Sequence, residues 1–250
     1  MERPTSTDDW DRHWGDYAEA AAANPAQRYR LRLILSHLAF SGARAHLVDI
    51  GSGQGDLLVE VRRRWPQTEL LGIELSEAGC RIARLKVPHA TLLQRDLLKP
   101  GDVPPAFRRW GSHAVCSEVL EHVDRPDRLL LNASAFLAPG CRLVVTVPGG
   151  PMSAFDRHIG HRRHYTQETL SAVLEAAGLE VERVAAAGFP FHSLYRLAVL
   201  ARGRNLAADV AGPSSWFRRG VMRAFDATFR LNLPTSPWGW QLVAIARVPG

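Results

Sequence analysis

The sequence predicts an α/β fold, a mainly parallel sheet with helices on both faces. Three observations support it. Short apolar runs typical of strands alternate with helical periodicity along most of the chain. A glycine-rich turn joins the first such run to a helix. The 250 residues, of which 46% are apolar and 22% charged, suit one large domain that needs no disulfide or metal to fold.

The elements are expected in the following order. Apolar residues recur at three- and four-residue steps over residues 10–40, which predicts helix. Strands are predicted at His46–Ile50, Glu69–Glu74, Ala90–Gln94, His113–Ser117, Arg142–Val147, Leu179–Ala186 and Gln241–Val248. Intervening helices are predicted from the glycine turn through Trp65, from a Ser76 cap through Leu85, over Pro126–Leu137, and from a Thr166 cap to Ala177.

An unusually long connection, residues 188–239, separates the last two predicted strands. Its second helical pattern, Trp216–Leu231, places phenylalanine or valine at every fourth position, with arginines elsewhere. The segment carries seven arginines against two aspartates, so most of the chain's net charge of +6 lies here. Packing of the apolar stripe onto the core is the favoured interpretation, and peripheral membrane contact through residues 216–231 is the alternative.

The cysteines and the first residues indicate the compartment. Cys80, Cys116 and Cys141 are odd in number and have no CxxC spacing, which excludes a zinc ribbon or a disulfide scaffold and suits a reducing compartment. No run reaches the roughly eighteen apolar residues of a membrane-spanning helix, and the first residues lack a signal-peptide core. We therefore expect a cytoplasmic protein.

The most informative segment is Asp49-Ile50-Gly51-Ser52-Gly53-Gln54-Gly55-Asp56. It lies between a strand and a helix, at the sheet edge where open α/β folds bind ligands. Its spacing is GxGxG, whereas a dinucleotide fingerprint would need glycine in place of Asp56. A carboxylate there disfavours a pyrophosphate, and therefore NAD or FAD. A tight turn without a ligand is the alternative interpretation.

Two further acids end the next two predicted strands. Glu74 follows Gly55 by nineteen residues and is placed to accept hydrogen bonds from both ribose hydroxyls of a nucleoside. Asp96 is placed to accept from an adenine amino group. Each acid alone is more often a solvated strand-end charge. Together with the glycine turn they predict a nucleoside site.

These motifs, with Ser117-Glu118-Val119-Leu120-Glu121-His122-Val123 and Leu137–Leu143, resemble the ordered motifs of class I S-adenosylmethionine-dependent methyltransferases. The similarity spans about residues 45–187 and the final strand, and is strongest to ubiquinone-biosynthesis O-methyltransferases and bacterial natural-product methyltransferases. The resemblance implies a Rossmann-like, seven-stranded sheet with an antiparallel last strand. It also implies one domain: a helical lid (1–44), a cofactor-binding core (45–187), a substrate-side insertion (188–239) and a last strand (240–250).

The resemblance also implies roles for particular residues. The turn from Asp49 through Gly51, Ser52, Gly53 and Gly55 would hold the methionine part of S-adenosylmethionine. The remaining cofactor contacts would come from Glu74 and Leu75 at the ribose, Asp96 and Leu97 at the adenine, Ser117 at the sulfonium, and Tyr17 and Arg28 of the lid at the carboxylate.

Three interpretations of the acids and histidines stay open. Glu118, Glu121 and His122 are expected to share one end of a helix, and His161, His164 and Tyr165 lie in a later polar segment over the same edge. In the first interpretation these residues lie in a solvated polar loop. In the second, one of His161, His164 and Tyr165 is a base in the substrate site. Alternatively, they hold a divalent cation such as Mg²⁺ on Glu118, Glu121 and His122, with His161 as fourth ligand. The ExxEH pattern resembles the metal motif of small-RNA terminal 2′-O-methyltransferases.

The acceptor is expected to be a small molecule or a lipid-linked compound, methylated at a hydroxyl. RNA is the second candidate, but only two lysines and no RNA-binding module accompany ExxEH, so a nucleic-acid partner is disfavoured. A non-catalytic S-adenosylmethionine-binding protein is a third. The sequence fixes no oligomeric state.

Overall fold

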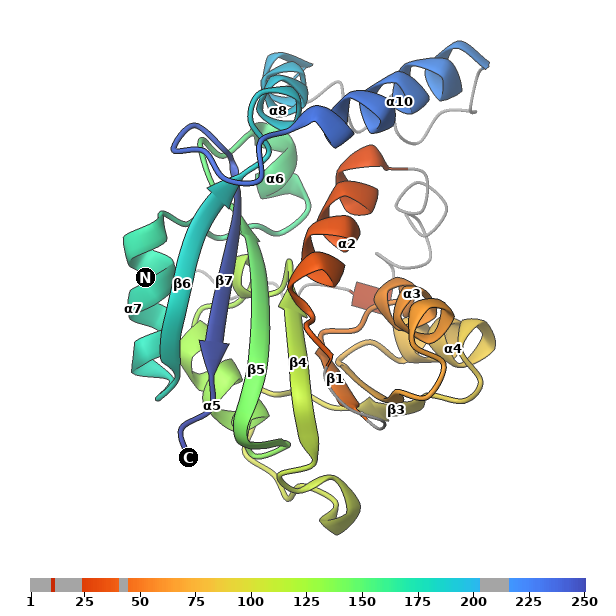
Figure 1. The fold of residues 1–250 in the computed structure, drawn as a ribbon, viewed down its shortest axis with the longest axis vertical. Helices are drawn as coiled ribbons and strands as arrows, with labels where there is room; N and C mark the ends of the chain where they lie inside the picture. Colours follow the sequence, from red (N-terminus) through yellow and green to blue (C-terminus); the bar gives the residue numbers. More distant parts are fainter. Residues whose placement is uncertain (1–9, 12–23, 41–44, 203–215) are drawn as a thin grey trace, which may run out of the picture.

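A computed structural model describes residues 10–11, 24–40, 45–202 and 216–250. Their core is a seven-stranded sheet of order β3-β2-β1-β4-β5-β7-β6 (Figure 1). The strands are β1 (His46–Ile50), β2 (Glu69–Glu74), β3 (Thr91–Gln94), β4 (Gly111–Ser117), β5 (Leu137–Pro148), β6 (Glu180–Ala187) and β7 (Gln241–Arg247). The first five pair in parallel, and β7 lies antiparallel between β5 and β6. The predicted sheet, including its antiparallel last strand, is confirmed.

Helices cover both faces of the sheet. They are α2 (Pro25–His37), α3 (Asp56–Arg64), α4 (Glu77–Lys86), α5 (Pro126–Ser134), α6 (Ala154–His158), α7 (Gln167–Ala176), α8 (Phe191–Arg202) and α10 (Trp216–Thr228), with 3-10 turns η1 (Pro105–Phe107), η2 (Leu120–His122) and η3 (Phe229–Leu231). One core cluster joins the sheet to α2, α3 and α4, and a second joins its other face to α5 and α7. No helix of the described residues is long and apolar enough to cross a bilayer.

Several element boundaries differ from the sequence prediction, and one helix was not predicted. The helix predicted over 126–137 ends at Ser134, because Leu137 already pairs with Gly111 as the first residue of β5. Asn24 caps α2, whose first residue is Pro25, and residues 12–23 of the predicted N-terminal helix, including Tyr17, lie outside the described part. The sequence analysis missed α6, although Ser153 and Asp156 form its capping box.

Helices α8 and α10 of the insertion lie beyond the end of the sheet where β6 finishes and β7 begins (Figure 1). A third cluster contains Tyr29 of α2 and Phe229 of η3, with Phe191, Tyr195 and Phe225 packed against it. Phe229 is 1% exposed. At Phe225 and Phe229, therefore, the predicted apolar stripe packs onto α2 and α8.

The N-terminus of α8 is capped from a distant part of the chain. Asn232 Oδ1 accepts hydrogen bonds from the backbone N–H groups of Phe191 (2.8 Å) and His192 (3.2 Å). Its Nδ2 has no hydrogen-bond partner among the described residues. The side-chain oxygen of Asn232 therefore caps α8 and joins it to the segment after η3.

We expect Asn232→Ala to lower the free energy of unfolding by about 0.5–2 kcal/mol, because two N–H groups at a helix start lose their acceptor. Asn232→Asp keeps an acceptor at the same place and should stay close to the wild type. Urea unfolding of the three proteins measures the difference. An equal loss in both variants would contradict the capping role.

Candidate functional site

The glycine turn between β1 and α3 requires glycine at two positions. Gly51 and Gly55 have φ of 73° and 81°, a left-handed conformation that side chains disfavour. A Cβ atom on Gly51 would collide with the Val119 side chain, and one on Gly55 would lie 3.0 Å from Ala83 Cβ. The turn thus lies against both the segment after β4 and helix α4.

Glu74, the last residue of β2, closes this turn from the side. Its Oε2 accepts from Gly53 N–H (2.7 Å) and its Oε1 from Ser76 N–H (2.9 Å). Burial raises the pKa of this carboxyl group, while the backbone N–H groups of Ser76 and Gly53 oppose that rise. Each carboxylate oxygen has a second lone pair, so two hydroxyl groups of a ligand have acceptors here.

Asp49 lies beneath the turn and is 3% exposed. Burial, and then the nearby charges of Glu74 and Asp56, raise the pKa of Asp49 to about 8. Asp56 itself turns away toward Lys86, whose Nζ lies 2.7 Å from its Oδ1. A ligand with a positive group over Asp49 would favour its ionised form.

The predicted adenine residues follow β3. Asp96 Oδ1 accepts from Leu98 N–H (2.9 Å), and its Oδ2 lies 3.3 Å from Lys99 Nζ. Leu97 is buried in the core. Asp96 therefore shapes its own turn, with its carboxylate still partly exposed.

Three other predicted cofactor residues lie on or beside the turn. The Ser52 hydroxyl is buried without a hydrogen-bond partner among the described residues and faces the backbone at Gly72. Leu75 is 47% exposed at the end of β2. The Ser117 hydroxyl lies 2.8 Å from the Thr146 hydroxyl at the end of β4. The structure thus brings these residues to one sheet edge.

The Arg28 side chain, predicted to contact the cofactor carboxylate, points toward α10. Arg28 Nε lies 3.3 Å and Arg32 Nη1 3.0 Å from Asp226 Oδ1 of α10, whereas Arg30 Nε lies 3.7 Å from Glu118 Oε2. Residues four apart share a helix face, and one two positions away points to the opposite side. Arg30, which the sequence analysis missed, is therefore the α2 arginine beside the acidic segment.

The analysis also missed two N-terminal residues. Asp11 Oδ1 accepts from the Ser76 hydroxyl (2.6 Å) and Ala78 N–H (3.0 Å), next to the N–H that Glu74 holds. The Trp10 ring lies 4.7 Å from the His122 ring, edge to face. Asp11 therefore contacts the segment after β2, and Trp10 contacts His122. No periodicity in the sequence predicted either contact.

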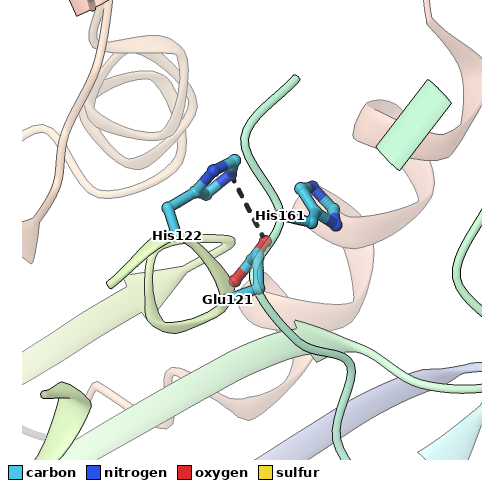
Figure 2. A group of neighbouring side chains, drawn as sticks. All are labelled: Glu121, His122 and His161. Atoms are coloured by element: carbon cyan, nitrogen blue, oxygen red, sulfur yellow. Dashed lines mark ion pairs between the residues drawn. The ribbon is translucent and has the colours of Figure 1, made fainter. Parts of the chain in front are cut away.

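The acidic and histidine residues after β4 form a close group with His161 (Figure 2). Glu121, His122 and His161 each offer one ligand atom, all within 4.8 Å of one another. Glu121 is fully buried, and neither carboxylate oxygen has a hydrogen-bond partner among the described residues; His122 Nε2 is 3.9 Å away. Burial, followed by the charge of Glu118, raises the pKa of Glu121 well above its usual range.

Glu118 lies beside this group but outside the close trio. Its φ of 55° is left-handed, and Gln241 Nε2 donates to its Oε1 (2.9 Å). Such strain in a residue other than glycine is often found at functional sites. Gln241, at the start of β7, also donates to the Val147 carbonyl (3.0 Å) and so fixes the Glu118 carboxylate from below.

Two more predicted residues support the group. The Tyr165 hydroxyl donates to the Leu120 carbonyl (2.9 Å), which holds the turn that carries Glu121. His164 Nε2 lies 3.1 Å from His161 Nδ1. The neighbouring Asp156 forms a bidentate pair with Arg196 (3.0 and 2.7 Å). Although burial of the carboxyl group opposes its ionisation, this pair lowers the pKa of Asp156.

The donor set fits a divalent cation. A buried carboxylate without hydrogen bonds is unfavourable unless it is protonated or neutralised by a cation, and an imidazole nitrogen on each side completes a three-ligand group. His161 is held neutral, since burial and then His122 lower its pKa to about 3. Asp156, His161 and His164 form a second close group, but Arg196 already neutralises Asp156.

Comparison with known proteins gives the family. A model described as "Methyltransferase domain" matches residues 22–184. The trans-aconitate 2-methyltransferase of Paracidovorax citrulli is 28% identical over 144 residues, 56% of this chain and 50% of that protein. The chain thus spans about half the length of the curated relatives it matches.

Solved structures share the fold. Phosphoethanolamine N-methyltransferase 2 of Haemonchus contortus, bound to phosphomonomethylethanolamine and S-adenosylhomocysteine, matches 100% of this chain and 62% of its own (16% identity, TM-score 0.66). Geranyl diphosphate C-methyltransferase of Streptomyces coelicolor, bound to Mg²⁺, geranyl-S-thiolodiphosphate and S-adenosyl-L-homocysteine, matches 89% of this chain and 76% of its own (18% identity, TM-score 0.57).

Proposed function

The chain belongs to the class I S-adenosylmethionine-dependent methyltransferases, and we propose that it transfers the cofactor's methyl group to a hydroxyl oxygen of a small-molecule or lipid-linked acceptor. One observation carries this proposal. The Glu74-braced glycine turn and the group Glu121, His122 and His161 lie at the same sheet edge, joined by the contact between Gly51 and Val119. A methyl donor bound at the glycine turn would thus lie next to the group that would activate an acceptor.

We propose one orientation of the cofactor on the turn. Glu74 would accept from the ribose hydroxyls, Asp96 and Leu97 would face the adenine, and Gly51, Ser52 and Gly53 would pass beneath the methionine part. Asp49 would lie below its positive groups. Ser117, at the end of β4, would then lie beside the sulfonium.

A sulfonium methyl is already activated, so the protein chiefly holds the acceptor in line and excludes water. Such positioning supplies on the order of 7–11 kcal/mol of barrier reduction. A hydroxyl acceptor must also lose a proton. We propose that Glu121, His122 and His161 serve this step by holding a divalent cation, which when bound lowers the pKa of the acceptor oxygen; His161 as the base is the alternative.

S-adenosylmethionine binding tests the core of the proposal. Isothermal titration of the full chain should show saturable binding of S-adenosylmethionine and none of NAD(H). Failure to bind would overturn the methyltransferase function. With binding established, transfer of a labelled methyl group to trans-aconitate, phenolic acids, prenylated phenols and RNA would separate the acceptor classes, and transfer to none would favour a non-catalytic binding protein.

Chelation separates the cation from the histidine base. We expect EDTA to lower turnover by at least about 100-fold, with recovery on adding Mn²⁺, Co²⁺ or Mg²⁺ back, because a proton-transfer step typically contributes 10²–10⁴-fold. Two imidazoles favour transition metals over Mg²⁺. Full activity in EDTA would leave His161 as the base.

The affinity for S-adenosylmethionine should rise with pH from about 6 to about 7.5. Below its pKa of about 8, Asp49 holds a proton in the free protein. A cationic ligand favours the carboxylate, so binding releases that proton and becomes tighter as pH rises, by up to about tenfold per pH unit. Asp49→Asn should flatten this dependence, and the exposed Asp102→Asn should not; a dependence unchanged in Asp49→Asn would contradict the assignment.

Arg30 supports an acceptor with a carboxylate or phosphate. Its guanidinium is half-buried beside Glu118 at the acidic group. A cation bound at Glu121 would weaken the Arg30–Glu118 pair and make the arginine available to an anion. Peripheral membrane contact through 216–231 is a further proposal; Leu231 is exposed at the end of that segment.

A further inference from the structure

His161 is the first member of a series of three hydrogen-bonding groups. Its Nδ1 lies 3.1 Å from His164 Nε2, and His164 Nδ1 lies 3.1 Å from the Gly150 carbonyl oxygen. These contacts join two loops, one after β5 that carries Gly150 and one after α6 that carries both histidines.

A carbonyl oxygen only accepts, so His164 must carry its proton on Nδ1 and donate it to Gly150. In a neutral imidazole the other nitrogen is then an acceptor, which requires His161 Nδ1 to be the donor between the two rings. We propose that His164 is a positioning residue that fixes His161 in a single tautomer, protonated on Nδ1 with the lone pair on Nε2.

The carboxylate beside His164 is already engaged by other groups. Asp156 Oδ2 is 3.7 Å from His164 Nε2 and would attract a proton there. However, Arg196 pairs with both Asp156 oxygens, and Ser153 N–H donates to Oδ2 at 2.7 Å. The carboxylate is thus neutralised, and both lone pairs of Oδ2, the oxygen facing His164, are engaged. Burial lowers the pKa of His164, with Asp156 and the Gly150 carbonyl opposing that effect.

The fixed tautomer gives the site its chemistry, and this consequence rests on the proposed function. A ring nitrogen with a lone pair is what a cation ligand and a general base both need. Among the described residues, no hydrogen bond to His161 Nε2 is recorded. If the proton were on Nε2, that nitrogen of His161 could neither bind a cation nor accept a proton.

Histidine-selective ¹⁵N labelling of the full chain tests the tautomer without any activity measurement. Long-range ¹H–¹⁵N correlations, with His161 assigned by its loss in His161→Gln, should show Nδ1 with the shift of a protonated nitrogen and Nε2 with that of an unprotonated one. The reverse pattern, a doubly protonated ring or an averaged pattern would overturn the proposal.

Variants of His164 test the cause. His164→Phe keeps a flat ring without the acceptor, and should turn the His161 signals into a mixture of tautomers; His164→Gln offers an acceptor and should restore the single pattern. His158→Phe, an exposed histidine nearby, is the matched control. A single unchanged tautomer in His164→Phe would overturn the role of His164.

Titration with Co²⁺ alone connects the tautomer to function. His164→Phe should weaken Co²⁺ binding about 10–100-fold, as removal of an outer-sphere partner typically does, and His164→Gln should recover most of it. If the wild type binds no Co²⁺, the cation proposal fails, whereas the NMR pattern still decides the tautomer.

Discussion

Glu74→Gln is expected to weaken S-adenosylmethionine binding by about 100-fold or more. The wild-type carboxylate accepts from Gly53 and Ser76 N–H groups on its two oxygens. A glutamine has one oxygen, so in either orientation its NH₂ group faces a backbone N–H. The variant loses charge-assisted hydrogen bonds of about 1.5–3 kcal/mol each and misplaces the turn itself.

Isothermal titration and thermal unfolding together measure this prediction. The free energy of unfolding should also fall, by about 1–3 kcal/mol, because a backbone donor is left buried without an acceptor. Glu69→Gln, on the exposed end of the same strand, should change neither quantity. Wild-type affinity in Glu74→Gln would remove the ribose assignment.

Glu121→Gln is expected to change activity and stability in opposite directions. In chelator at about pH 8 it should raise the free energy of unfolding by about 1–3 kcal/mol, because burial raises the pKa of this carboxyl group and so opposes folding at a pH where the unfolded chain is ionised, whereas glutamine is neutral in both states. Methyl transfer should fall at least about 100-fold, because the acceptor oxygen loses its activating group. Functional residues often carry such a cost in stability.

The cation should reverse the order of stability. Mn²⁺ or Co²⁺ should bind the folded wild type and raise its melting temperature, whereas Glu121→Gln should respond little. Glu175→Gln, an exposed acid on α7, is the control. If Glu121→Gln were as active as the wild type, the cluster would be structural.

Local sequence signals predicted the sheet and the glycine turn. Strand apolarity, helix caps such as Ser76, and the positive φ of Gly51 and Gly55 are properties of short segments and do not depend on distant partners. The end of the helix at Ser134 was missed, because pairing with β4 outweighs helix propensity at Leu137. Residue spacing also placed Glu74 correctly at the end of β2.

Side-chain direction and long-range pairing lay beyond the sequence. The residue spacing did not predict that Arg28 pairs with Asp226 while Arg30 faces Glu118. These pairs depend on the orientation of α2 relative to α10. Likewise, Gln241 reaches Glu118 only because β7 inserts beside β5. The sequence by itself determined the fold, the family and the place of Glu74 at the end of β2, because local patterns encode them. Tertiary packing alone decided which acid is buried without hydrogen bonds and which histidine nitrogen holds the lone pair, because both depend on atoms brought together from distant segments.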